Sequence, residues 1–328
     1  MSENPLRKLH RLVLGCCIAL TTHGVALASD CDSRQRYTIL IHGGTVDSAS
    51  ELTDAHFRLM RSIVVAARAE LSRGGAALDV VVDAIVRMED SGLLNAGKGS
   101  FRNTAGMVET DASLMEGHTG RIGAVAAMQR LKNPILAARL VMDDTPHVLF
   151  AGPNGEQTLV GLGAETVEDP AAYFVPSRVP TDDKESGTVG AVAMDRCGHL
   201  AAGTSTGGYP GKLPGRVGDS PIIGASTYAG DLYALSATGR GENFIRRSVT
   251  LDIAKRAEYL GTPLQEAANF VVHRLLGDID DIDGAVIAIG RDGQIVLAAV
   301  NVLGALHGYA SESTAPVVGA KIAQADVD

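Results

Sequence analysis

The chain has no tryptophan, only four cysteines, and just 4% aromatic residues among its 328 positions. It also lacks a basic segment interleaved with aromatics, and its formal net charge is -9. Because an acidic chain is repelled by nucleic acid and by anionic membranes, we expect neither as a partner. A small molecule or a peptide is the favoured ligand.

Several well-known catalytic motifs are missing. The sequence contains no G-x-S-x-G elbow, no HExxH, no P-loop, no EF-hand loop and no C-x-x-C pair, and its nine histidines are scattered singly. These absences argue against a Ser-His-Asp hydrolase of the elbow type, a zinc peptidase and a nucleotide-binding loop. We therefore expect no cofactor.

The composition that is present describes a globular protein. Hydrophobic residues make up 45% of the chain, which suffices for a sizeable core, and there are 38 glycines without any low-complexity run. Glycine permits positive φ and close approach of backbones, so its abundance indicates tight turns and closely packed sheets.

The N-terminus has the layout of a secretory signal peptide. Arg7, Lys8 and Arg11 precede the apolar run "LVLGCCIAL", and small residues at 26–28 offer a cleavage position. The run is too short to span a bilayer as an anchor. We expect residues 1–28 to be removed and the product to be exported, into the periplasm of a bacterium, with no membrane association afterwards.

Cysteine placement leaves one question open. Cys16 and Cys17 go with the signal peptide, and lipid attachment at Cys16 is a weaker alternative because the apolar stretch before it is very short. Cys31 and Cys197 remain, and an oxidising compartment permits their pairing, although spacing alone does not establish it. Cys197 lies in "DRCGH", which favours an ordinary turn residue over a nucleophile.

The first half of the chain alternates strand and helix patterns. "TILI" at 38–41 predicts a buried strand that stops at a Gly-Gly turn, and residues 53–73 and "ALDVVVDAIVRMED" show helical spacing. "NTAG" predicts a hairpin turn, "RIGAVAAM" a strand, and "NPILAARLVMDD" a helix with proline in its first turn.

The second half begins after a segment without periodicity. Residues 166–187, with prolines at 170, 176 and 180, predict a mobile linker. A hairpin follows from "TVGAVAMD" and "LAAGTST", then strands from "SPIIGASTYAG" and "LYALSATG", and helices from "GENFIRRSVTLDIAKRAEYL" and "PLQEAANFVVHRLL". "GAVIAIGRDGQIVLAAVNV" predicts a closing hairpin with Asp-Gly in its turn. This order indicates a layered α+β sandwich.

Small hydroxyl residues and charged residues gather at the ends of the predicted strands in this half. Taken singly, a threonine fits β propensity and a loop Arg or Asp fits solvated charge. The grouping is what favours a site, and it comprises Thr188, Thr204, Ser205, Thr206, Arg216, Asp219 and Thr238.

Three segments then resemble, in order and spacing, those of the plant-type asparaginase and isoaspartyl peptidase family: "SGTVGAVAMDRCGHLAAGTSTGG", "KLPGRVGDSPIIGAS" and "SATGRGENFIR". "IHGG", "LLNAGKGS", "MVETDASLMEG" and "NPILAAR" resemble its other landmarks, so the similarity runs from about Ile39 to near the C-terminus. These are threonine-dependent N-terminal nucleophile hydrolases related to glycosylasparaginase. The resemblance implies an α+β fold, a four-layer αββα sandwich of the N-terminal nucleophile hydrolase type.

The resemblance also implies a maturation step. The precursor would cleave itself between Gly187 and Thr188, giving an α subunit of residues 29–187 and a β subunit of 188–328 that assemble as (αβ)2. A glycine before the threonine tolerates the strained conformation that this attack needs. The new α-amine of Thr188, with an unperturbed pKa of about 7.7–8.0, would serve as the base, so no catalytic histidine is required.

Residue roles follow from the same similarity. Thr206 would orient the Thr188 hydroxyl, and Thr238 with the Gly239 amide would form the oxyanion hole. Arg216 would bind a substrate carboxylate as a planar two-donor fork, Asp219 would bind the ammonium, and Gly239 and Gly241 would add backbone contacts. The implied reaction is hydrolysis of β-aspartyl dipeptides, of L-asparagine, or of both, through a β-aspartyl ester on Thr188.

"MEDSGLLNAGKG" resembles the family's sodium-binding loop, in which Asn95 supports the site. Backbone carbonyl oxygens suit a hard cation, although an ordinary turn is the alternative for this segment. The carbonyls implied as ligands belong to Met88, Glu89, Ser91, Leu94, Ala96 and Lys98.

The chain departs from the family pattern at three places. Ser186-Gly187-Thr188 stands where the family commonly has His-Gly-Thr, "IHGGTVD" replaces "HGGAG", and "NVLGALHGY" replaces the segment around "NTEGMYRG". These changes bear on the leaving-group side of the pocket. Cleavage of glycosyl-asparagine, and a periplasmic binding protein that does not mature, therefore stay open as alternatives.

Overall fold

The computed structural model describes residues 36–46, 52–176, 187–277 and 283–322. These belong to one compact unit that begins at Asp32, and the expected signal peptide lies outside the described residues. Among the described residues, no helix combines the length and the apolar character needed to cross a bilayer.

The strands form two sheets. The larger has eight strands in the order β12-β11-β1-β5-β6-β2-β3-β4, and the smaller has four in the order β10-β9-β8-β7. The larger sheet contains β1 (Thr38–Val46), β2 (Thr110–Glu116), β3 (Ile122–Met128), β4 (Leu149–Ala151), β5 (Val189–Met194), β6 (Leu200–Thr206), β11 (Gly304–Ser311) and β12 (Val317–Gly319). The smaller contains β7 (Thr227–Ala229), β8 (Tyr233–Gly239), β9 (Gly284–Gly290) and β10 (Ile295–Val300).

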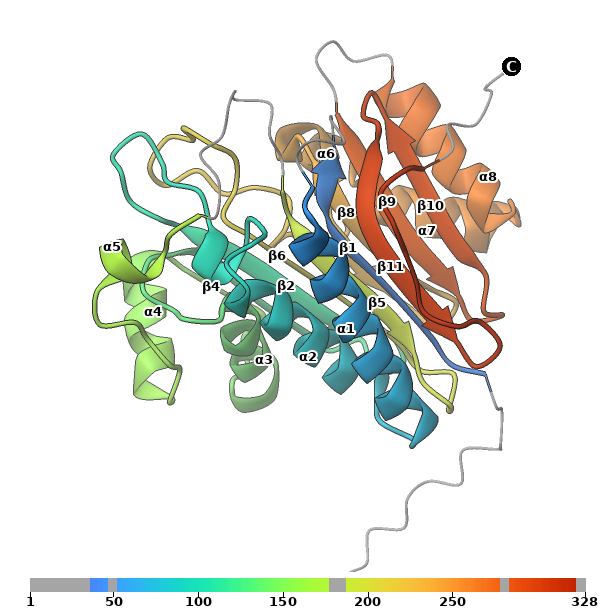
Figure 1. The fold of residues 1–328 in the computed structure, drawn as a ribbon, viewed down its shortest axis with the longest axis horizontal. Coiled ribbons are helices and arrows are strands. Elements are labelled where there is room, and N and C mark those ends of the chain that lie inside the picture. Colours follow the sequence, from blue (N-terminus) through green and yellow to red (C-terminus); the bar gives the residue numbers. More distant parts are fainter. Residues whose placement is uncertain (1–35, 47–51, 177–186, 278–282, 323–328) are drawn as a thin grey trace, which may run out of the picture. The chain divides into compact units, whose positions relative to one another are not determined.

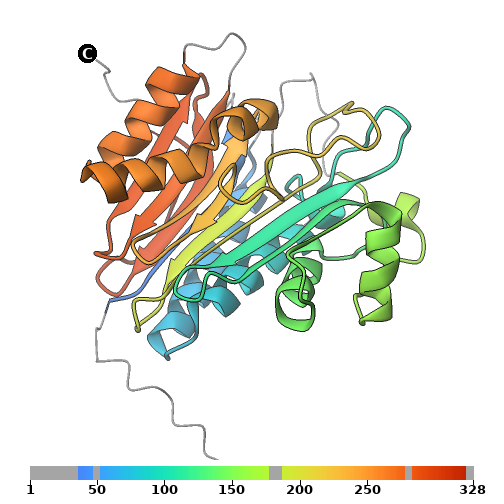
Figure 2. The same ribbon diagram turned by 180° about the vertical axis from the view of Figure 1, so that it is seen from behind.

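Five of the helices lie on the outer faces of the two sheets. Figures 1 and 2 show α1, α2 and α3 along the larger sheet and α7 and α8 along the smaller one. The bounds are α1 (Asp54–Ser72), α2 (Ala77–Asp90), α3 (Pro134–Asp144), α4 (Gly152–Gly161), α5 (Pro170–Tyr173), α6 (Gly241–Arg247), α7 (Val249–Leu260) and α8 (Leu264–Asn269), with a 3-10 turn at Gly97–Gly99 and a π-helix at Phe270–Leu276.

The alternation of strand side chains explains the layers. Ile39 and Ile41 of β1 pack with the helices of the larger sheet, whereas Leu40 packs between the sheets. Successive residues of a strand point to opposite faces, so a run that is apolar at every position must be covered on both sides. Ile287 of β9 meets Leu40 in the same inter-sheet cluster. The result is a mixed α/β fold with two facing sheets.

Most of the expected elements are confirmed at or near their predicted bounds, among them α1, α2, α3, the β5–β6 hairpin and the β9–β10 hairpin with its Asp-Gly turn. The strand expected at 38–41 is longer than predicted. β1 continues through the two glycines, with a register shift between His42 and Thr45, to Val46. Pairing with β11 supplies the hydrogen bonds that carry the strand past the expected turn.

The expected linker is structured at its beginning. Thr166 bridges to Leu131, α5 follows, and Phe174 is fully buried beside Val108 and Val167. Residues 166–176 are therefore packed rather than extended, because apolar side chains there find a core that local periodicity does not reveal. Residues 177–186 lie outside the described residues.

Two further expectations need correction. The helix predicted across residues 241–260 is broken at Ser248, whose φ of 48° ends α6 and starts α7. The strand predicted from "SPIIGASTYAG" is reduced to β7, because turns occupy the residues before Thr227.

Candidate active site

Thr188 is buried at the start of β5 beside the end of β6. Its Oγ1 donates a hydrogen bond to Thr206 Oγ1 at 3.0 Å, and its side chain is 5% exposed. Thr206 Oγ1 also accepts from the Gly208 amide at 3.0 Å, which fixes the orientation of the second hydroxyl. The antiparallel pairing of Val189 with Ser205 brings these two threonines opposite each other. A hydroxyl is thus held in a defined direction at the ends of two central strands of the larger sheet.

The peptide before Thr188 is tightly enclosed. A Cβ added to Gly187 would lie 2.8 Å from Asn95 Cβ. Gly44, with φ of 101°, packs on the other side, and a Cβ there would lie 2.7 Å from Gly187 Cα. Both positions therefore require glycine.

Asn95 braces the turn that follows β6. Its Oδ1 accepts from the Phe101 amide at 3.0 Å, and its backbone carbonyl accepts from the Gly207 amide at 3.1 Å. Its Nδ2 donates to the Gly208 carbonyl. Asn95 thus connects the loop after α2 with the turn beside Thr206, while its Cβ lies against Gly187.

Thr238 and Gly239 end β8 of the facing sheet. Ser236 contacts Thr204 across the sheets, with the two hydroxyl oxygens 2.8 Å apart. The starts of β6 and β8 lie together, because Gly117 contacts both Leu200 and Gly230. The two strands therefore run in the same direction, and Thr238 lies at the end where Thr206 lies. Thr238 Oγ1 is buried and has no hydrogen-bond partner among the described residues. Gly239 has φ of 149° and allows no side chain, because a Cβ would lie 2.4 Å from the Asp283 carbonyl oxygen.

Arg216, Asp219 and Gly241 come together just after the end of β8. Asp219 is 4% exposed, and burial raises its pKa to about 6 although the charge of Arg216 lowers it. Its Oδ2 has no partner among the described residues. A Cβ on Gly241 would lie 2.6 Å from Asp219 Oδ1 and 2.9 Å from Arg216 Nη2, so the start of α6 fits closely against both charged groups.

Three buried polar residues of this region were not singled out from the sequence. His42 Nε2 lies 2.9 Å from Ser236 Oγ, and burial lowers the pKa of His42 to about 3, outweighing the opposing contact with the Thr188 backbone. Asp111 pairs with Thr206 across β2 and β6 and accepts from the Gly218 amide at 3.2 Å. Lys212 Nζ donates to the Glu109 carbonyl at 2.6 Å.

The charges of Asp111 and Lys212 are both affected by burial. Burial raises the pKa of Asp111 and lowers that of Lys212, and each charge opposes the shift of the other. The only sequence signal was that each lies in a segment that resembles the family: His42 in "IHGG", Asp111 in "MVETDASLMEG" and Lys212 in "KLPGRVGDSPIIGAS". Their contacts join residues far apart in the chain, which no local pattern encodes.

The loop expected to hold sodium packs closely against its own carbonyl oxygens. A Cβ on Gly99 would lie 2.2 Å from the Leu94 oxygen, and one on Gly97 would lie 2.9 Å from the Glu89 oxygen. The Met88 carbonyl accepts from Ser91 Oγ at 2.7 Å, and those of Leu94, Ala96 and Lys98 accept from backbone amides. Each such oxygen keeps a second lone pair. The donor set fits a hard cation in chemistry.

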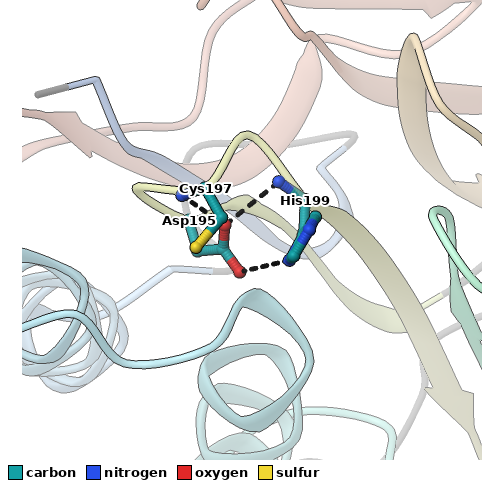
Figure 3. A group of neighbouring side chains, drawn as sticks. All are labelled: Asp195, Cys197 and His199. Atoms are coloured by element: carbon teal, nitrogen blue, oxygen red, sulfur yellow. Dashed lines mark hydrogen bonds and ion pairs between the residues drawn. The ribbon is translucent and has the colours of Figure 1, made fainter. Parts of the chain in front are cut away.

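A second group of potential ligands lies at the opposite end of the β5–β6 hairpin. Figure 3 shows Asp195, Cys197 and His199 in the turn between these strands, with ligand atoms within 4.8 Å of one another. Asp195 Oδ1 accepts from the amides of Cys197 and His199, and Oδ2 accepts from the Ala77 amide. Cys197 is disulfide-bonded, which confirms that it is not a free nucleophile. The group is therefore a cross-linked turn that caps α2.

Placed together, the residues at the Thr188 end define a class of site. It has a buried hydroxyl aligned by another, a neighbouring donor without a partner, and a cation-anion pair able to bind a zwitterion. A hydroxyl oriented in this way can act as a nucleophile, and a cation and an anion side by side can bind an amino-acid derivative.

Comparison with known proteins agrees with that class. The profile of the asparaginase family matches residues 35–175 and 165–320, and the chain belongs to this family. It is 39% identical over 285 residues to the isoaspartyl peptidase of Salmonella typhimurium, covering 79% of this chain and 90% of that protein. It is 40% identical over 284 residues to that of Escherichia coli, covering 79% and 88%, and 37% identical over 277 residues to the human isoaspartyl peptidase/L-asparaginase, covering 79% and 88%.

Proposed function

We propose that this chain is an autoprocessing amidohydrolase that hydrolyses β-aspartyl dipeptides, L-asparagine, or both, with Thr188 as the nucleophile. Family membership and the names of its relatives support the reaction class. The observation that carries the proposal is the Thr188 hydroxyl, 3.0 Å from that of Thr206 and adjacent to the enclosed Gly187.

Self-cleavage is the first step of the proposal. Thr188 Oγ1 attacks the Gly187 carbonyl carbon, the C–N bond breaks, and the acyl group passes to oxygen as an ester. Water then hydrolyses the ester, leaving a carboxylate on Gly187 and a free α-amine on Thr188. Gly44 and Asn95, which lie against Gly187, hold the peptide in place for this attack.

Turnover uses the same hydroxyl. The α-amine of Thr188 accepts the Oγ1 proton, Oγ1 attacks the substrate β-carbonyl, and the departing amine takes a proton, leaving a β-aspartyl ester that water hydrolyses. Thr238 Oγ1, buried and without a partner among the described residues, would donate to the developing oxyanion together with the Gly239 amide. A preorganised donor of this kind contributes about 3–4 kcal/mol.

Two charged residues, Arg216 and Asp219, would bind the substrate. Arg216 would bind the α-carboxylate and Asp219 the α-ammonium, with backbone contacts from Gly239 and Gly241. The unpaired Oδ2 of Asp219 supports this role, because a buried acceptor without a partner is costly unless a ligand supplies a donor.

We also propose how the layers of the fold and the subunits are organised. The two facing sheets with outer helices support a four-layer αββα sandwich of the N-terminal nucleophile hydrolase type. We propose an α subunit ending at residue 187, a β subunit of 188–328, an (αβ)2 assembly, and export to the periplasm after removal of residues 1–28. Light scattering and N-terminal sequencing of the exported protein test these points. The loop around residues 88–98 would hold a sodium ion in a structural role.

Intact-mass analysis of purified protein tests the central proposal. We expect a fragment that begins at Thr188, no cleavage in Thr188→Ala, and retained cleavage in Thr188→Ser, which keeps a hydroxyl. A chain that stays whole after prolonged incubation would instead support a binding protein. Ammonia release from asparagine and leucine release from β-aspartyl-leucine then rank the substrates, and faster turnover of glycosyl-asparagine than of either would favour the sugar-amide alternative.

A further inference from the structure

The guanidinium of Arg216 already has a carboxylate partner. Arg216 Nε donates to Glu242 Oε1 at 2.9 Å, and Nη2 donates to Oε2 at 3.0 Å. This is a bidentate pair with two parallel hydrogen bonds, the strongest common geometry for arginine. It occupies the edge of the guanidinium formed by Nε and Nη2.

The surroundings leave one edge for a ligand. The Tyr209 ring lies 4.6 Å from Arg216 Cζ and covers a face of the guanidinium. A Cβ on Gly218 would lie 2.6 Å from Nη1, and one on Gly241 would lie 2.9 Å from Nη2. The Nη1–Nη2 edge is therefore bordered by two residues without side chains, and it retains N–H donors that Glu242 does not use.

Glu242 is held in its ionised form, which lets it stay paired with Arg216. Burial alone would raise its pKa, but the hydrogen bonds and charge of Arg216 outweigh burial and lower it below the ordinary value. Its side chain is 36% exposed, against 13% for Arg216. Glu242 follows Gly241 in the first turn of α6, so the element that contacts Asp219 also sets the angle of the Arg216 fork.

We propose that Glu242 is a positioning residue for substrate binding: it holds the Nε–Nη2 edge of Arg216, so that the Nη1–Nη2 edge faces the α-carboxylate of the substrate. This inference rests on the proposed function.

Glu242→Gln tests the inference with little change in shape. An amide can accept from only one N–H of the fork and presents a donor to the other, so the bidentate pair is lost. We expect KM for β-aspartyl-leucine to rise about tenfold, the scale of one charge-assisted hydrogen bond, with a smaller change in kcat. Glu116→Gln is the matched control, because Glu116 pairs with Arg121 at the other end of β2. We expect KM for that variant to match the wild type.

A double-mutant cycle separates positioning from a structural effect. In an Arg216→Ala background, Glu242→Gln should change KM by less than about twofold, because the guanidinium through which Glu242 acts is absent. An equal rise in both backgrounds would overturn the inference, and so would a fall in KM, which would mean that Glu242 competes with the substrate. Completion of self-cleavage identifies folded preparations of each variant.

Binding of L-aspartate, measured by calorimetry, tests the role of Glu242 independently of the proposed hydrolysis. Aspartate carries the same α-carboxylate and α-ammonium, and we expect Glu242→Gln to weaken its binding about tenfold. If the wild type bound aspartate without hydrolysing any amide, the proposed function would fail and the affinity of Glu242→Gln would still decide the inference. A wild-type protein that bound no aspartate, or equal binding by both proteins, would refute it.

Discussion

Replacing Gly44 by alanine should slow self-cleavage in addition to destabilising the fold. The added Cβ would lie 2.7 Å from Gly187 Cα, whereas carbon atoms in contact prefer about 3.5–4.0 Å. One of the two backbones must therefore move by about 1 Å. A misplacement of that size costs about 100-fold in rate when reacting atoms must be aligned, and we expect that loss in the cleavage of the Gly187–Thr188 bond.

Gly163→Ala is the control for the stability that Gly44→Ala loses through its strained backbone. Gly44 has φ of 101°, and Gly163 has φ of 105° with nothing within 4 Å of an added Cβ. Both alanine variants should lose about 1–3 kcal/mol of unfolding free energy from the strained φ. Only Gly44→Ala introduces a contact with Gly187, so only it should cleave slowly.

The assay is intact-mass spectrometry of freshly purified precursor over time, with urea unfolding of both variants alongside. Cleavage of Gly44→Ala at the wild-type rate would show that the Gly187 peptide does not depend on this packing. Equal slowing in both variants would trace the effect to stability rather than to the contact. Either result would refute the reasoning.

Three further predictions concern the same chain. The proposed ammonium contact requires Asp219 as a carboxylate, and burial raises the pKa of Asp219 to about 6. We therefore expect kcat/KM to fall as the pH drops through about 6, and a pH–rate profile of Asp219→Asn should lack that inflection. Thr206→Val should lower kcat by about 100-fold with little change in KM, and Thr206→Ser should restore most of the rate in steady-state assays. Cys197 is disulfide-bonded, and the other cysteines, Cys16, Cys17 and Cys31, all precede the cleavage site. Cleaved protein should run as one band without reductant and as two bands with it, whereas two bands without reductant would contradict a bond within the chain.

Local patterns predicted the elements that depend on nearby residues. The apolar spacing of α2 and the Asp-Gly turn between β9 and β10 both specify their own structure, because the interacting residues lie within one turn of each other. Ser248 shows the limit of such patterns. Its left-handed backbone interrupts a continuous helical pattern, and packing of α7 against β8 favours the break.

The candidate site divides in the same way. Thr188, Thr206, Arg216, Asp219 and Thr238 could be selected from the sequence, because each stands at the end of a predicted strand or in a segment that resembles the family. Glu242 lies in one of those segments, next to Gly241, but its role could not be assigned from the sequence, because that role depends on a pairing across 26 positions of the chain.

By itself the sequence determined the strands, the helices and the polar groups at their ends, since hydrophobic periodicity and turn chemistry act between neighbours. Only the tertiary structure decided that Gly44 and Asn95 enclose Gly187, that Glu242 fills one edge of Arg216, and that Phe174 is buried. Each of these depends on which distant segments the packing of the two sheets brings together, and contacts of that kind have no counterpart in local spacing.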